Sequence, residues 1–153
     1  MLSVVRQAHH ERVETLREFL ATESSGVLST HSARHGGYPF GSLTPYALTE
    51  HSEPILLLSQ LAEHTRNLQA APRASLFVQQ TGAADAQDAM RVTLLGTVAR
   101  GEDAELRERY VARHPQAESY FAMADFGLYV LRVEHVRFVA GFGEMGWLSA
   151  PFD

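Results

Sequence analysis

Six segments of this 153-residue sequence have the short apolar, β-branched pattern of β-strands, and tight turns join several of them in succession. The expected strands are residues 26–32, 39–48, 54–59, 74–79, 91–101 and 126–139. Gly36 and Gly37 mark the first hairpin turn. Pro45 cannot donate a backbone hydrogen bond, so the second strand should lie at a sheet edge or bulge there. Successive hairpins favour an antiparallel barrel, because a parallel sheet needs a helix between consecutive strands.

Helical patterns surround these strands. They cover residues 3–22, 63–71, 102–114 and 116–123. The apolar stripe of the first helix consists of Val5, Val13, Leu16 and Leu20. The glycine-rich segment 141–146 is expected to be a turn into a tail anchored by Trp147. The sequence therefore predicts a mainly β protein with flanking helices (α+β class), in a single domain of residues 1–153 that begins with the helix 3–22.

The composition excludes several classes of function. The sequence contains no cysteine, which excludes disulfides, zinc–thiolate sites, iron–sulfur clusters and thiol catalysis. The net charge is −5, from 13 basic and 18 acidic residues, so non-specific nucleic-acid binding is not expected. No run approaches the roughly 18 apolar residues of a membrane span, and the N-terminal segment lacks the apolar centre of a signal peptide. We therefore expect a cytoplasmic protein with no membrane partner.

The histidine pairs do not predict a metal site. His9 and His10 are adjacent, and His31 and His35 lie four residues apart. A stable site needs three or four convergent ligands, and no acidic or thiol partners stand at a recognisable spacing.

The segment SQLAEHTRNL, residues 59–68, places several hydrogen-bond donors where a strand ends and a helix begins. The unpaired N–H groups and partial positive charge of a helix start suit a phosphate, and His64, Thr65 and Arg66 can each donate to one. Glu63 is an unfavourable neighbour for an anion unless it points away. A capped surface helix with solvated side chains would explain the same residues, so both interpretations stay open.

The run LLSQLAEHTRNLQAAPRASLFV, residues 57–78, resembles the flavin-binding stretch of the split-barrel FMN-binding superfamily, which includes the pyridoxamine 5′-phosphate oxidases. It is most similar to the haem-utilisation (HugZ/HutZ-like) branch. The segments GVLST, GGYPFGSLTPYAL, RVTLLGTVAR, RHPQAESYFAMADFGLYVLRVEHVRFVAGFG and WL fit that branch in the same order, over roughly residues 14–148. The resemblance implies a six-stranded antiparallel split barrel that forms a homodimer, with two FMN sites between the subunits.

The resemblance also implies which residues hold the FMN phosphate. His64 stands where many members carry a lysine for this phosphate, and Thr65 lies beside it. Ser59 and Gln60 match the strand end that lines the ribityl chain and the phosphate. A dianionic phosphate favours such a helix start with charged or polar donors.

The flavin ring has its own implied contacts. Gly41, Ser42 and Leu43 match the strand whose backbone follows the ring, and Gly41 has no Cβ to keep a flat ligand away. Arg91 matches a polar position that reaches the cofactor in the oxidases. Without the resemblance, an arginine at a strand start would be interpreted as a surface ion pair.

Two positions match the haem-utilisation branch, and one expected residue is missing. Asp125 matches an acid placed near haem, and Thr30 matches its possible partner. The haem-degrading members use a histidine near the C-terminus as the axial iron ligand, but residues 140–153 contain none. We therefore expect haem to bind weakly, at micromolar affinity or worse. His135 could replace the ligand only if its strand opens towards the cleft.

The oxidases also carry a C-terminal segment with arginine and histidine that holds pyridoxal, and this segment too is not matched. The predicted function is therefore that of an FMN-binding flavoprotein, an oxidoreductase for a small or planar substrate, with no catalytic residue assigned. One alternative is a haem-binding or haem-degrading protein on the same scaffold. The other is a flavin-binding module without robust turnover.

Overall fold

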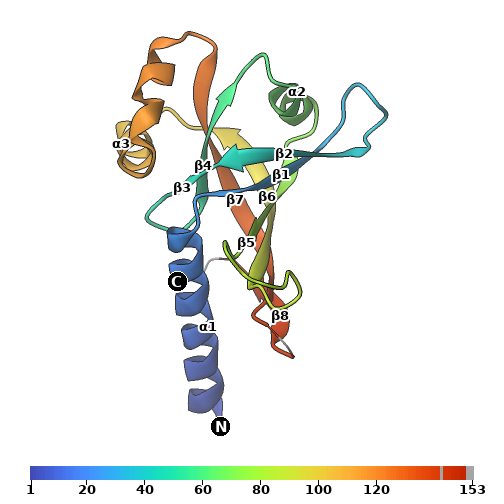
Figure 1. Cartoon of the computed structure of the whole chain (residues 1–153), viewed down its shortest axis with the longest axis vertical. Coiled ribbons are helices and arrows are strands. Elements are labelled where there is room, and N and C mark those ends of the chain that lie inside the picture. The colour runs from blue at the N-terminus through green and yellow to red at the C-terminus, as the bar shows by residue number, and fades with distance from the viewer. Residues whose placement is uncertain (142, 151–153) are drawn as a thin grey trace.

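The structure of the chain is a computed structural model, which describes residues 1–141 and 143–150. The strands are β1 (Ser25–His31), β2 (Pro39–Pro45), β3 (Ala47–Leu48), β4 (Pro54–Ser59), β5 (Arg73–Gln79), β6 (Arg91–Arg100), β7 (Phe126–Val139) and β8 (Met145–Ser149). The helices are α1 (Leu2–Thr22), α2 (Glu63–Ala70), α3 (Ala104–Arg113) and the 3₁₀ helix η1 (Pro115–Ala122). The strands form one antiparallel sheet with the helices around it (Figure 1). The expected mainly β architecture with flanking helices is therefore confirmed.

The strands follow the order β2-β1-β5-β6-β7-β4-β3, and β8 pairs with β7 outside this path. The sheet twists and curves into a half-barrel (Figure 1). Because β2 and β3 stand at opposite ends of the order, the chain crosses from one edge of the sheet to the other through Tyr46. This crossing gives the split-barrel shape.

The expected count of six strands is wrong, because the described residues contain eight. One reason is that the expected strand 39–48 is divided. Pro45 ends β2, which lies at the sheet edge as its proline predicts. The N–H of Tyr46 then bonds to the carbonyl oxygen of Ser24 at 3.0 Å, and β3 continues by pairing with β4 instead.

The second reason is that the expected tail forms β8, which pairs with β7. Leu148 points into the core, whereas Trp147 is 60% exposed, so the expectation that Trp147 anchors the tail is wrong. Phe142 lies outside the described residues. A five-residue strand with one buried apolar side chain leaves little alternation for sequence analysis to detect.

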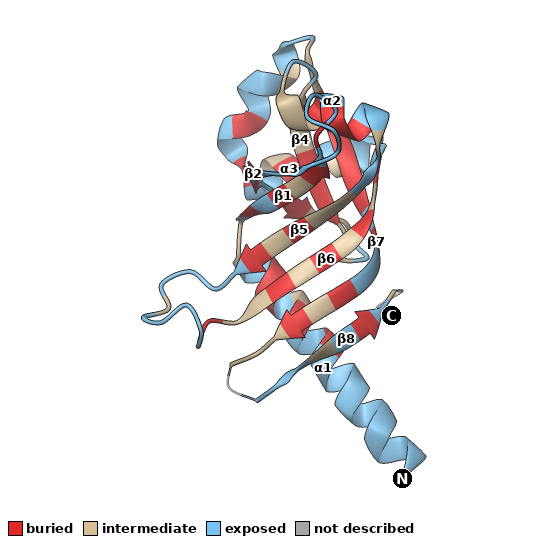
Figure 2. Ribbon diagram, turned by 90° about the vertical axis from the view of Figure 1, so that its right-hand side faces the viewer, coloured by how far each residue is buried: buried red, intermediate tan, exposed pale blue. Residues whose placement is uncertain are grey.

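The core lies between the concave face of the sheet and the C-terminal half of α1. Val13, Leu16 and Leu20 of the expected stripe are buried, but Val5 is 62% exposed. Residues 1–12 are exposed throughout, and this half of α1 projects beyond the sheet (Figure 2). No helix among the described residues is long and apolar enough to cross a membrane.

Candidate functional site

The polar residues of the segment 59–68 gather where β4 leads into α2. Ser59 donates from its Oγ to Oδ2 of Asp125 at 3.0 Å, and the N–H of Gln60 donates to the carbonyl oxygen of Asp125 at 2.7 Å. Asp125 directly precedes β7, which pairs with β4. These bonds fix the chain direction just before α2 begins, at Glu63.

His64 and Thr65, in the first turn of α2, carry buried polar atoms without partners. Nδ1 of His64 lies 3.2 Å from Oγ of Ser42 on β2. Its Nε2 is buried and has no hydrogen-bond partner among the described residues, and the same holds for Oγ1 of Thr65, whose side chain is 0% exposed. Buried polar atoms are nearly always hydrogen-bonded, so these two atoms in one helical turn are available to bind a polar group of a ligand.

The electrostatics of this turn suit an anion. The N-cap residue of α2, Ala62, has no side chain that could cap the first N–H groups. Glu63, which would repel an anion, accepts a 3.1 Å charged hydrogen bond from Nε of Arg34. Burial lowers the pKa of His64, so its imidazole is neutral near pH 7. If Ser42 donates to Nδ1, the proton of this neutral ring sits on Nε2, which can then donate to an anion.

Thr30 and Asp125 do not form the pair that the haem-branch resemblance suggests. The partner of Asp125 is Ser59, and Thr30 accepts a 3.0 Å bond from Nδ2 of Asn67 on α2. Oδ1 of Asn67 also accepts from the N–H of Ala33 at 2.9 Å. Asn67, which is 1% exposed, therefore fastens α2 to the end of β1 and to the turn that follows.

Asn67 is not among the residues that the sequence predicted for the site. The available signal was its place beside Leu68 on the buried side of the helix, where an amide must find partners. Arg34 was missed as well, because its partner Glu63 lies 29 residues away in the sequence.

Three of the expected FMN residues lie away from the start of α2. Gly41 and Leu43 alternate with Ser42 along β2, so they face the opposite side of the sheet, and Leu43 is 77% exposed. Arg91 pairs with Gln79 at the C-terminal end of β5, whereas β5 pairs with β1 through its middle residues 75–77. Its guanidinium donates to three carbonyl oxygens of the preceding loop, those of Ala86, Gln87 and Ala89.

The structure thus brings one group of expected residues together around α2 within a single chain. This group consists of Thr30, Ser42, Ser59, Gln60, His64, Thr65 and Asp125. Gly41, Leu43 and Arg91 take no part in these hydrogen bonds.

Comparison with known proteins supports the split-barrel assignment. The chloroplastic non-canonical haem oxygenase HOZ of Arabidopsis thaliana is 36% identical over 146 positions, which cover 88% of this chain and 44% of that protein. The structure of a haem-binding protein from Mycobacterium smegmatis is 35% identical with a TM-score of 0.82, covering 90% of this chain and 57% of that one. This chain therefore spans about half the length of these two relatives.

A more distant structure extends the likeness to the oxidases. A protein of the pyridoxine-phosphate oxidase family from Clostridium acetobutylicum, related to a general stress protein, has a TM-score of 0.69 over 92% of this chain and 95% of its own. At 13% identity this likeness concerns the fold alone. The expected resemblance to the split-barrel superfamily and its haem-utilisation branch is confirmed.

The sequence profile of the CREG β-barrel family matches residues 7–151, nearly the whole chain. The chain therefore belongs to the CREG β-barrel family.

Proposed function

We propose that this chain is a haem-binding protein of the haem-utilisation type. The relatives that are 35% and 36% identical are a haem-binding protein and a haem oxygenase. The structural observation that carries the proposal is the pair of orphaned atoms at the start of α2, Nε2 of His64 and Oγ1 of Thr65. Haem carries two propionate carboxylates, and a helix start with two unused donors suits such an anion.

Residues of this chain would orient that carboxylate. Ser42 fixes the ring of His64 through Nδ1, and Thr65 offers a hydroxyl from the same turn. Asn67 holds the helix against β1, so the donors keep their direction. When bound, haem would supply a redox-active iron centre for oxygen chemistry.

The test is a titration of haemin into the purified protein, followed at the Soret band. Saturable binding at one haem per chain is expected. The double variant His64→Gln, Thr65→Val should bind haem at least about tenfold more weakly, since each bond to a charged group contributes about 1.5–3 kcal/mol. The control Gln69→Ala changes an exposed residue of the same helix and should bind normally. No saturable Soret change with the unaltered protein would overturn the function.

FMN binding is the second candidate, because the orphaned pair would suit a phosphate as well as a carboxylate. An FMN-dependent oxidoreductase and a flavin-binding module without turnover would both use this phosphate site. The further expected FMN contacts are Gly41, Ser42, Leu43, Ser59, Gln60 and Arg91. The same double variant should then lose about tenfold or more in FMN affinity, while riboflavin, which has no phosphate, binds as before. Equal weakening of both ligands, or of neither, would contradict a phosphate site at α2.

We also propose that the chain forms a homodimer through the outer face of the sheet. Leu43 pairs with Val27 and Val27 with Phe77, which makes an apolar row across three strands. Leu43 and Val27 are 77% and 37% exposed, and Trp147 on β8 is 60% exposed. Exposed apolar rows of this kind mark interaction surfaces. Sedimentation should show a dimer at micromolar concentration that Leu43→Glu converts to a monomer.

A further inference from the structure

A pocket of about 330 Å³ opens between the C-terminal end of α1, the strand β3 and the helix α3. None of its lining residues belongs to the group around α2, so it is separate from the proposed haem site. Its volume falls within the usual range of small-molecule sites, about 300–1,000 Å³. A water-sized group occupies roughly 30 Å³, so the pocket suits a compact ligand of about ten non-hydrogen atoms and is too small for haem.

Apolar side chains form the floor of this pocket. Leu20 and Tyr46 are only 2% and 1% exposed, and Ala47 and Leu48 continue the apolar surface along β3. The hydroxyl of Tyr46 is already engaged, because it donates to the carbonyl oxygen of Leu20 at 2.6 Å. The floor therefore offers a ligand apolar contact area rather than a hydroxyl group.

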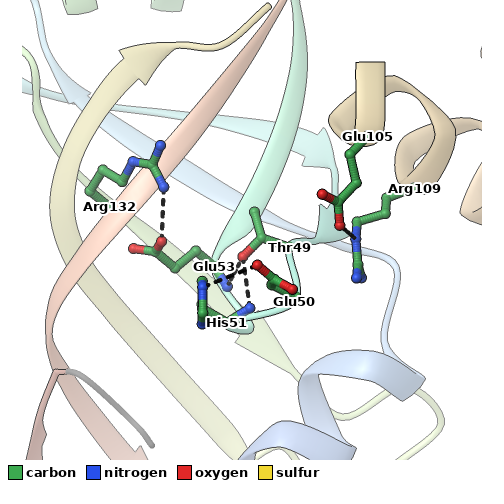
Figure 3. Close-up of polar contacts among 7 residues, drawn as sticks. All are labelled: Thr49, Glu50, His51, Glu53, Glu105, Arg109 and Arg132. Carbon is green, nitrogen blue, oxygen red and sulfur yellow. Dashed lines mark hydrogen bonds and ion pairs between the residues drawn. The ribbon is translucent and has the colours of Figure 1, made fainter. Parts of the chain in front are cut away.

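Two arginines of α3 stand at the rim of the pocket. Arg109 donates from Nε to Oε1 of Glu105 at 3.0 Å and projects towards the end of α1 (Figure 3). Its Nη1 and Nη2 have no hydrogen-bond partner in the described part of the chain. Arg113, one turn later, donates from Nη2 to the carbonyl oxygens of Thr22 and Glu23 at 3.2 and 3.4 Å. The two terminal amino groups of Arg109 are thus available to a ligand.

The charges at the rim favour an anionic group. Glu23 is the one carboxylate among the described residues that line the pocket. Both of its oxygens bind Thr81, since Oε1 accepts from the N–H at 3.0 Å and Oε2 accepts from Oγ1 at 2.6 Å. Arg109 and Arg113 then face the pocket as two cations beside one engaged carboxylate. The planar guanidinium of an arginine matches a carboxylate, which can accept two parallel hydrogen bonds.

Hydrogen bonds join the three walls of the pocket. The N–H of Tyr46 donates to the carbonyl oxygen of Ser24 at 3.0 Å. The carbonyl oxygen of Tyr46 lies 2.7 Å from Nε2 of His114, which directly follows α3. The hydroxyl of Tyr46 and the guanidinium of Arg113 both bind carbonyl oxygens at the end of α1. The pocket is therefore preformed, as small-molecule sites usually are.

We propose that this pocket binds a small monocarboxylate with an apolar body, of the size of a medium-chain fatty acid. The carboxylate accepts from the terminal amino groups of Arg109 at the rim. The apolar body lies on Leu20, Tyr46 and Leu48 and is removed from water there. This site goes beyond the proposed haem function, with which it shares no residue.

The experiment titrates octanoate into the protein and follows binding by isothermal titration calorimetry. Saturation at one octanoate per chain is expected. Octan-1-ol has the apolar chain without the charge, and acetate has the charge without the chain. Each should bind at least about tenfold more weakly than octanoate, because each lacks one half of the interaction.

Two variants test the two halves of the pocket separately. Arg109→Gln removes the charged donor and should weaken octanoate binding about tenfold or more, while octan-1-ol binds as before. Ala21→Phe places a ring in the pocket from an exposed position of α1 and should weaken both ligands. The control Arg107→Gln changes an arginine of α3 that pairs with Glu118 outside the pocket, and it should bind octanoate normally. Circular dichroism checks the fold of each variant.

The outcomes that would overturn the proposal are distinct. The site is wrong if the unaltered protein shows no saturable octanoate binding, or if Ala21→Phe and Arg109→Gln both bind octanoate normally. Equal affinities for octanoate and octan-1-ol, or an equal loss in Arg107→Gln, would contradict the role of Arg109. Haemin binding should be the same in Arg109→Gln and in the unaltered protein, so a failure of this site leaves the haem proposal untouched.

Discussion

Replacing Asn67 by alanine should loosen α2 from β1 and destabilise the whole protein. The change removes the 3.0 Å bond to Oγ1 of Thr30 and the 2.9 Å bond from the N–H of Ala33. Each lost bond costs about 0.5–1.5 kcal/mol, and a buried group left without a partner costs about 1–3 kcal/mol. Thr30 is 3% exposed and Asn67 is 1% exposed, so water reaches this site poorly. The expected loss in free energy of unfolding is about 2–4 kcal/mol.

The assay is urea unfolding followed by circular dichroism, with Gln69→Ala as the control on the exposed side of the same helix. The control should change the free energy of unfolding by less than about 0.5 kcal/mol. Asn67→Ala should also weaken ligand binding at α2, because His64 and Thr65 lose their fixed direction. If Asn67→Ala is as stable as the control, the amide does not fasten α2 to β1.

Three further predictions concern stability. Burial lowers the pKa of His64, so between pH 6.5 and the lower pKa of the folded state the unfolded chain binds more protons, and the free energy of unfolding should fall as the pH drops. Urea titrations at several pH values should show a smaller fall for His64→Gln than for the unaltered protein. An identical fall would contradict the buried neutral ring. Gly96→Ala should lower the melting temperature far more than Gly41→Ala, because a Cβ at Gly96 would collide with the carbonyl oxygen of Arg132, whereas a Cβ at Gly41 would stand 3.1 Å from a Val27 methyl group. Equal melting temperatures would refute the close approach of Gly96 to Arg132. Glu53→Ala leaves the N–H of Val133 without its acceptor, so the free energy of unfolding in urea should fall by about 1–3 kcal/mol. Glu50→Ala on the same turn should leave the free energy of unfolding almost unchanged.

The sequence predicted the fold well where one segment carries its own signal. Pro45 predicted an edge strand because it has no amide proton, and β2 ends at this residue. The Gly36–Gly37 turn joins β1 to β2 as expected. β8 was not predicted, because it is a strand through its pairing with β7, and no local sequence pattern indicates that pairing. The β-bulge in β7 opposite Leu95 and Gly96 could not be predicted either. It is held by Glu53, which lies 80 residues from its partner Val133 in the sequence.

In the candidate site, too, only the residues that belong to a local sequence pattern were predicted. His64 and Thr65 stood out because a helix start after a strand is a local pattern with a known electrostatic consequence. Asn67 and Arg34 did not, since their partners come from distant parts of the chain. The exposure of both Glu134 and His135 depends on a register shift of one residue, which no sequence periodicity expresses.

The most direct test of the haem proposal is a competition between the two cofactors. The protein is incubated with equimolar haemin and FMN, desalted, and its bound haem and flavin are measured by absorbance. A haem-binding protein of this type should retain close to one haem per chain and little flavin. Retained flavin with haem washed away would contradict it.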